Sequence, residues 1–115
     1  MFEEHKYIQG MFAFEGRGLE VPVSFEPRVV YRVPSDKHTH VTYCRLGNPT
    51  TEFLYVVVER DGKSIRLFPC GAKNGIHVPH AVHEDILPDS VIELRVAAPE
   101  GVAAKVMIDL GLVEV

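Results

Sequence analysis

Hydrophobic positions along the chain fall in short runs, and in several of these runs they alternate with polar positions. In the segment 91–97, VIELRVA, the apolar residues Ile92, Leu94 and Val96 alternate with charged residues. A period of two places successive side chains on opposite faces of a β-strand. No stretch carries a sustained apolar spacing of about 3.6 residues with capping residues, which an amphipathic helix requires. The pattern therefore predicts an all-β domain.

Turn-forming residues divide these runs into separate predicted strands. Asp61-Gly62 is a strong signal for a two-residue hairpin turn, and Pro22 restricts its strand to a sheet edge or a bulge. About seven or eight short strands at this spacing predict a single antiparallel β-sandwich of the jelly-roll or Ig-like type, with a small barrel as the alternative. Two strands are expected in the N-terminal hairpin or arm, at His5–Phe14 and Leu19–Phe25. Seven follow, at Arg28–Val33, His38–Leu46, Glu52–Arg60, Lys63–Phe68, Ile76–Val78, Val91–Ala97 and Lys105–Val115.

Two of these runs give more detailed expectations about which residues face the core. In the segment 38–46, HTHVTYCRL, the alternation places Cys44 inside and Val41 on the outer face. In the last strand a bulge at Gly111 is expected to shift the phase of the alternation.

The first part of the chain, residues 1–26, is expected to form a β-hairpin or arm beside a sandwich domain of residues 27–115. The arm is more apolar than an isolated two-stranded hairpin tolerates in water. We therefore expect it to pack on the sandwich or on a neighbouring subunit. The alternative is that its apolar residues complete the core of a monomer, because small domains need every apolar side chain. The residues expected to make interface contacts are Phe2, Tyr7, Met11, Phe12 and Phe14.

Length and charge limit the class of protein further. The chain has 115 residues, enough for one small domain, and a formal net charge of −4. It has no block of Lys and Arg, so we expect no nucleic-acid partner. It has no apolar run of membrane-spanning length and no apolar N-terminal signal, so we expect a soluble protein made in a cytoplasm, with no membrane partner. The two cysteines lack the CxxC spacing and are expected to be free thiols.

Histidines raise the alternative of a metal site. Imidazole is a common ligand for Zn, Fe, Cu and Ni. The segment IHVPHAVHEDILPDSVIEL resembles the second half of a cupin, but no acidic residue follows the first histidine pair at the spacing that a cupin ligand set requires. We therefore expect surface histidines, no metal and no cofactor, and keep a cupin-like metalloprotein as the enzyme alternative. Its ligands would come from His38, His40, His77 and His80, with His83 nearby.

Cys44 is the other residue with possible chemistry, as a nucleophile activated by a histidine. The sequence around it shows no strand-to-helix elbow or helix N-terminus that would lower the pKa of the thiol. We expect Cys44 to be a small buried hydrophobic residue. The sequence thus predicts no catalytic residue and a protein that is not an enzyme.

Three successive segments share their order of strands and turns with a known class of proteins. The first has Val-Pro, a polar turn and Thr-His-Val before a strand; the second has an apolar strand, a dipeptide turn and a return strand; the third has Leu-Pro-Asp before a strand of the I-E-L-R-V type. In this order they resemble small β-sandwich structural proteins of tailed bacteriophages. The segments are VPSDKHTHVTYCRLGNPT, TEFLYVVVERDGKSIRL and ILPDSVIELRVAAPEGVAAKVMI.

The resemblance covers about two thirds of the chain and implies a virion protein assembled in the cytoplasm of a host. The implied role is a capsid decoration or cement subunit that binds the major capsid protein, or another virion protein, and stabilises the shell. The implied assembly is a homo-oligomer, with a trimer favoured over a dimer. A tail or neck accessory protein is the alternative role, and residues 1–25 lie outside the resemblance.

Overall fold

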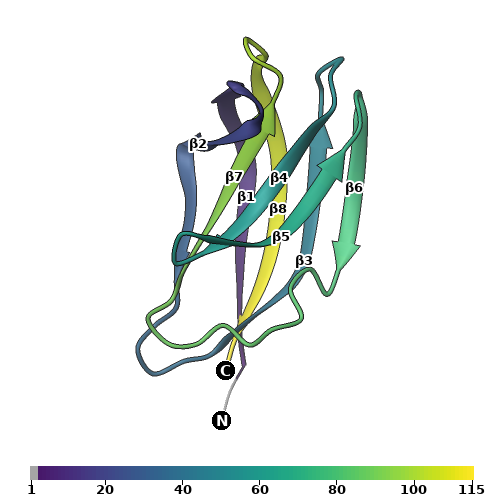
Figure 1. The fold of residues 1–115 in the computed structure, drawn as a ribbon. Helices are drawn as coiled ribbons and strands as arrows, with labels where there is room; N and C mark the ends of the chain where they lie inside the picture. The colour runs from purple at the N-terminus through teal and green to yellow at the C-terminus, as the bar shows by residue number, and fades with distance from the viewer. Residues whose placement is uncertain (1–2) are drawn as a thin grey trace.

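The computed structural model describes residues 3–115, and within them the chain forms eight β-strands and no helix (Figure 1). Every strand pairs antiparallel with its neighbours. The all-β, antiparallel prediction is therefore confirmed. The strands are β1 (Glu4–Glu15), β2 (Gly18–Arg32), β3 (Thr39–Asn48), β4 (Leu54–Arg60), β5 (Lys63–Cys70), β6 (Asn74–Pro79), β7 (Val91–Ala98) and β8 (Ala103–Glu114).

The strands belong to one sheet in the order β5-β4-β7-β2-β1-β8-β3-β6. The sheet curls until its two edge strands, β5 and β6, come near each other where residues 71–73 connect them (Figure 1). Its two halves meet at β1 and β2, which are joined at the pair Ala13 and Glu26. The result is a nearly closed, barrel-like sheet, and it is not clearly divided into the two separate sheets of a sandwich.

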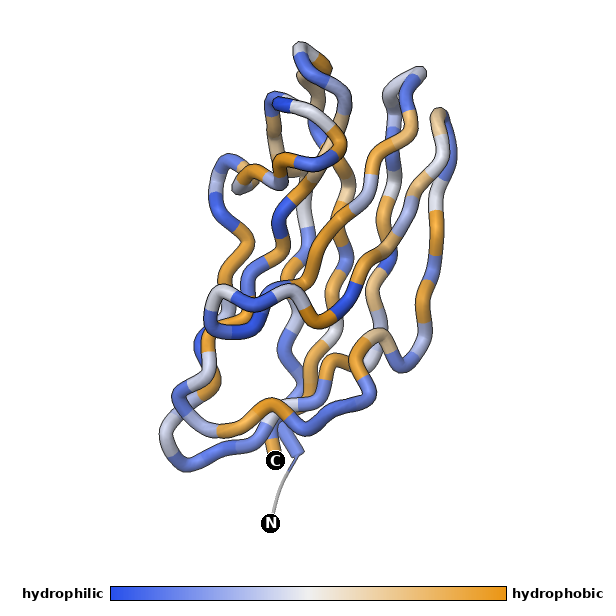
Figure 2. Tube along the Cα trace, in the orientation of Figure 1, coloured by the Kyte–Doolittle hydropathy of each residue, from blue (hydrophilic) through white to orange (hydrophobic). Residues whose placement is uncertain are grey.

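The core lies inside this barrel and is built by the alternation that the sequence carries. Hydrophobic and hydrophilic residues alternate along the strands in Figure 2, and the inward positions of β7 and β8 are almost fully buried, as predicted. The hairpin turn at Asp61 and Gly62 is also confirmed, since both residues have the positive φ that this turn requires. The largest fully buried side chains are Phe25, Phe68, Leu46, Leu54, Ile86, Ile92, Leu94, Ile108, Leu110, Leu112, Val29 and Val33.

The expected separation of residues 1–26 from a sandwich of 27–115 is not what the structure shows. Strand β2 runs through the expected boundary, and β1 pairs with β8 along its whole length, from Glu4 opposite Glu114 to Glu15 opposite Ala103. The rings of Phe12 and Phe14 each meet the buried ring of Phe25 edge to face, with centroids 6.3 Å apart. These first strands belong to the core because a β-barrel needs their apolar faces to fill its interior.

The structure corrects which residues of β3 face the core and where the irregularity between β3 and β8 lies. The register between β3 and β8 shifts at Thr42, so Val41 and Cys44 both face the core, and Val41 is not on the outer face. The irregularity thus lies in β3 and not at Gly111, which keeps β8 in register with β1. A side chain at Gly111 would overlap the ring of Tyr43, which lies across it. The glycine is needed for this close approach of an aromatic ring.

Candidate interaction surface

The outer face of β1, β8, β3 and β6 gathers residues that the core does not use. Most inward positions of these strands are buried or half-buried, and the alternate positions point to solvent. The register places these outward residues side by side in three rows across the four strands. The rows are Tyr7, Gly111, Tyr43 and Pro79; Gln9, Asp109, Arg45 and His77; and Met11, Met107, Gly47 and Gly75.

The middle row is a polar cluster centred on Asp109. Its Oδ1 accepts hydrogen bonds from the Tyr43 hydroxyl at 2.7 Å and from Gln9 Nε2 at 3.0 Å, and its Oδ2 lies 3.7 Å from Arg45 Nη1. Burial opposes ionisation of Asp109, but these hydrogen bonds and the charge of Arg45 outweigh it, and its pKa lies below the usual value. The cluster joins β1, β8 and β3 and holds the exposed guanidinium of Arg45 in place.

The third row borders a groove. Two adjoining hollows, of about 510 and 340 Å³, share Gly47, Gly75 and Met107, and both are shallow and open to solvent. The side chains of Met11 and Met107 remain 55% and 38% exposed beside them. We call these two hollows together the methionine groove. Its lining residues are Met11, Arg45, Leu46, Gly47, Asn48, Pro49, Lys73, Asn74, Gly75, Ile76, His77 and Met107.

The residues expected at an interface divide into two groups. Tyr7 and Met11 lie exposed on this outer face. Phe12 and Phe14 are buried in the chain's own core, so their expected role as contacts to a partner is wrong. Phe2 lies outside the described residues. Met107 was missed, although its place between the inward residues Val106 and Ile108 was a signal that it faces out.

The histidines expected as alternative metal ligands are not brought together as a site. His40 Nε2 lies 2.8 Å from Asp85 Oδ1, and His38 Nδ1 lies 3.4 Å from the other oxygen of that carboxylate. His77 instead packs its ring edge to face on Tyr43 in another part of the surface, and His80 is exposed. Within residues 3–115 no three His, Cys, Asp or Glu side chains are grouped so that they could hold a metal ion.

Cys44 is a core residue, as expected from its strand position. It is fully buried, and burial, together with the charge of Asp109, raises the pKa of its thiol to about 12. The thiolate, and not the thiol, is the nucleophilic form of cysteine. Cys44 therefore stays protonated and unreactive at neutral pH.

A second polar group that the sequence did not reveal closes the end of the barrel near the C-terminus. Glu114 is almost fully buried and accepts a hydrogen bond from the hydroxyl of Tyr31, which also lies 3.4 Å from Thr39 Oγ1. Burial and the hydrogen bond to Glu114 raise the pKa of Tyr31 to about 12. Since the tyrosine remains a hydrogen-bond donor at neutral pH, we assign this cluster a structural role.

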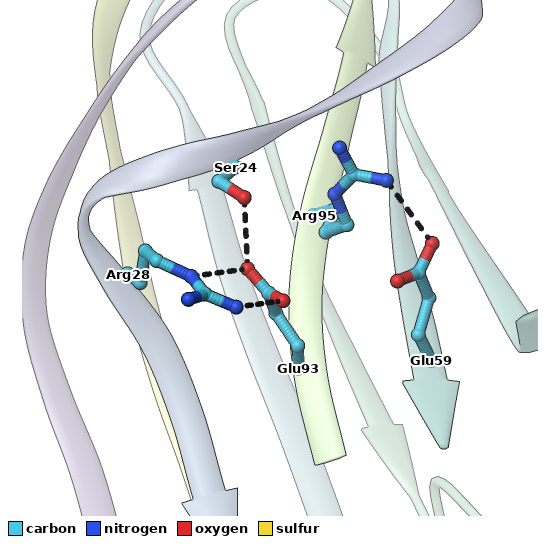
Figure 3. Close-up of polar contacts among 5 residues, drawn as sticks. All are labelled: Ser24, Arg28, Glu59, Glu93 and Arg95. Carbon is cyan, nitrogen blue, oxygen red and sulfur yellow. Dashed lines mark hydrogen bonds and ion pairs between the residues drawn. The ribbon is translucent and has the colours of Figure 1, made fainter. Parts of the chain in front are cut away.

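The outer face of β2, β7 and β4 differs from that of β1 and β8, because ion pairs cover its centre (Figure 3). Glu93 receives two hydrogen bonds from Arg28, at 2.6 and 3.1 Å, and one from Ser24 at 2.9 Å. Arg95 Nη1 lies 3.4 Å from Glu59 Oε2 on the adjacent strand. The hydrogen bond from Arg28 is the main reason that the pKa of Glu93 is lowered. The centre of this half of the surface is therefore occupied by its own polar contacts.

Replacement of Arg28 by alanine is expected to lower stability at neutral pH and to have less effect in acid. The lowered pKa of Glu93 means that its ionised form stabilises the fold above the usual carboxyl pKa. This contribution is lost as the pH falls through the lowered value. Urea unfolding of the wild type and of Arg28→Ala at pH about 7 and about 3 measures the difference, because urea, unlike guanidinium chloride, does not screen the ion pair. If Arg28→Ala lowered the free energy of unfolding by the same amount at both pH values, the assignment to Glu93 would be contradicted.

A scan against protein-family models finds no match for the chain, and a search of curated proteins finds no relative. Within residues 3–115 there is also no helical segment with the length and hydropathy that a membrane crossing requires.

Proposed function

We propose that the protein is a non-enzymatic structural subunit of a tailed-phage particle, a capsid decoration or cement protein that binds the major capsid protein. The observation that carries the proposal is the outer face of β1 and β8, where Tyr7, Met11 and Met107 stay exposed on a rigid sheet. Half-exposed apolar side chains grouped on a regular face are typical of a surface that contacts another protein. The sequence segments that resemble phage structural proteins add support.

The strand pairing supports a jelly-roll fold for this subunit. Strand β1 pairs with β8, β2 with β7, β3 with β6 and β4 with β5, so each pair is nested inside the previous one. Such nesting is what results when one long hairpin is wrapped around itself into eight strands. The jelly roll is an architecture of viral capsid, lectin and cupin domains. Fold alone does not select among these functions, and the exposed face favours assembly.

We also propose that the subunit forms a homo-oligomer, a trimer in preference to a dimer. A second exposed apolar patch, formed by Leu19 on β2 and Phe53 before β4, supports self-association. The patch is held in place by Tyr55, whose ring packs near Phe53 and whose hydroxyl donates a hydrogen bond to the carbonyl of Leu19. Repeated copies on a symmetric shell would turn weak contacts into strong overall binding. Sedimentation equilibrium of the purified protein counts the subunits.

Charge placed in the exposed face is expected to weaken capsid binding without unfolding the protein. Met11→Asp and Met107→Asp each put a carboxylate among the apolar contacts, and we expect binding to weaken at least about tenfold. The measurement is co-sedimentation of the protein with empty shells assembled from the major capsid protein of the same genome.

Leu67→Asp is the matched control for this experiment. Leu67 on β5 is 54% exposed, against 55% for Met11, but it lies in the other half of the sheet. We expect Leu67→Asp to bind shells as the wild type does. Wild-type protein that binds purified tails and not shells would replace the capsid role by that of a tail or neck accessory. Binding to neither particle would exclude both roles.

A further inference from the structure

The methionine groove has a floor of backbone. Gly47 on β3 and Gly75 on β6 are direct partners in the register, and both lie on the outer face. Neither has the left-handed φ that would demand glycine for backbone reasons. A Cβ atom at Gly47 would instead lie 3.3 Å from the Cβ of Met107 and would begin to fill the groove. A Cβ atom at Gly75 would lie 3.2 Å from the backbone oxygen of Leu46. Because neither position carries a side chain, the surface over β3 and β6 stays open here.

The groove is formed before anything binds in it. Its floor and one wall belong to three paired strands, β6, β3 and β8. One end is fixed by Asn48, whose side-chain amide donates hydrogen bonds to the carbonyls of Glu52 and Gly71, at 2.9 and 3.0 Å. The other wall is built by the thioethers of Met11 and Met107, which are unbranched and adapt to the shape of an apolar group. A rigid floor with adaptable walls suits an inserted apolar side chain.

The charge around the groove is opposite to the charge of the whole protein. The chain has a formal net charge of −4, yet Arg45 and Lys73 line the groove and Lys105 is exposed two residues from Met107 on the same face of β8. Asp109 in the middle row offsets the charge of Arg45, with which it pairs, so the positive charge beside the groove comes from Lys73 and Lys105. The field at the groove therefore attracts negative charge.

We infer that the methionine groove binds an extended, acidic segment of a partner protein. An aliphatic or aromatic side chain of that segment lies on Gly47 and Gly75 beside Met107, with Met11 on the far side of Met107, and a neighbouring carboxylate of the segment pairs with Lys73. In an extended segment alternate residues point to opposite sides, so a segment that lies edge-on along the groove can turn its apolar residues toward the methionines and its acidic residues toward Lys73. This inference rests on the proposed function in so far as the same face binds the capsid, and it names the chemistry of the bound segment.

The test is a titration of the intact protein with three synthetic peptides of about seven residues, each roughly 23 Å long when extended. The first alternates glutamate with leucine, the second lysine with leucine, and the third glutamate with alanine. Amide NMR shifts report the position of binding and the dissociation constant. We expect the glutamate and leucine peptide to shift the amides of Gly47 and Gly75 and to bind at least about tenfold more tightly than the other two. Equal binding of all three peptides, or shifts confined to other strands, would overturn the inference.

Two variants probe the two parts of the contact. Gly75→Leu fills the groove, and Lys73→Glu reverses the charge at its rim. Each variant is expected to bind the glutamate and leucine peptide at least about tenfold more weakly than the wild type does. Lys63→Glu makes the same charge change on β5, outside the groove, and is expected to leave the affinity within about twofold. If neither groove variant lowers the affinity for the peptide more than Lys63→Glu does, the inference is wrong.

The capsid experiment separates this inference from the proposed function. If Met11→Asp loses shell binding but no peptide binds to the protein, the proposal of an acidic segment is wrong and the decoration role stands. Peptide binding at Gly47 and Gly75 by a protein that binds no shells would support the groove and overturn the decoration role.

Discussion

Deletion of residues 1–25 is expected to leave a chain that does not fold. The deletion removes β1, which lies inside the sheet between β2 and β8, together with the first part of β2. It exposes one side of β8 along the whole strand and removes the buried rings of Phe12, Phe14 and Phe25 from the core. A domain of this size is stabilised by about 5–15 kcal/mol in total, and the loss of three aromatic side chains, at about 3–5 kcal/mol each, is comparable to that total.

Circular dichroism and the dispersion of NMR signals measure the outcome of this deletion. Phe25→Ala is the corresponding point variant, and we expect it to lower the free energy of unfolding by about 3–5 kcal/mol. Tyr7→Ala, on an exposed position of the same β1, is the control and should change it by no more than about 0.5 kcal/mol. A truncated protein of residues 26–115 that unfolds cooperatively would show that β1 is a dispensable arm after all.

The sequence predicted strands better than it predicted their neighbours. Alternation with a period of two identifies a strand and the two faces of its residues, and a dipeptide such as Asp61-Gly62 connects two adjacent strands. Neither signal says which distant strand pairs with which. The partner of β1 is β8, about a hundred residues away, and only burial of both apolar faces in one core brings them together. For this reason residues 1–26 resembled an arm when their sequence was considered alone.

The bulge in β3 had no sequence signal of its own. An unbroken alternation through Val41 and Cys44 puts one of them outside, and the structure buries both by giving Thr42 no partner on β8. The reason lies on the other strand, where Gly111 provides a flat place for the ring of Tyr43. Such a contact depends on a pair of residues on neighbouring strands, and the hydrophobic pattern of a single strand does not show it.

The candidate surface was predicted in part. Exposed apolar residues at Tyr7 and Met11 followed from the excess of apolar residues near the N-terminus, but their neighbours on the same face come from β8, β3 and β6. The groove depends on Gly47 and Gly75 standing opposite each other, and in the sequence both are ordinary turn glycines. Site residues from four strands become visible as a group only when the register is known.

Replacement of Asn48 by alanine is expected to lower the free energy of unfolding by about 2–4 kcal/mol. Asn48 is almost fully buried and its amide donates to three backbone carbonyls, those of Glu52, Cys70 and Gly71. Its Oδ1 accepts hydrogen bonds from the backbone N–H and the hydroxyl of Thr50. Alanine leaves these groups without a partner at the point where β3 ends and the loop meets the end of β5.

Asn48→Asp distinguishes lost hydrogen bonds from lost volume. Aspartate has nearly the same size, but its carboxylate cannot donate and would face the carbonyl oxygens, so the folded state raises its pKa above the unfolded value. The destabilisation is therefore expected to be large at neutral pH and to shrink as the pH falls and the carboxyl becomes protonated. Urea unfolding at several pH values measures it. Asn74→Ala removes an exposed asparagine that holds one local hydrogen bond, to the N–H of Gly75, and should cost no more than about 0.5 kcal/mol. If Asn48→Ala were as stable as Asn74→Ala, the buried amide would not be what fixes the loop and, with it, the closed end of the methionine groove.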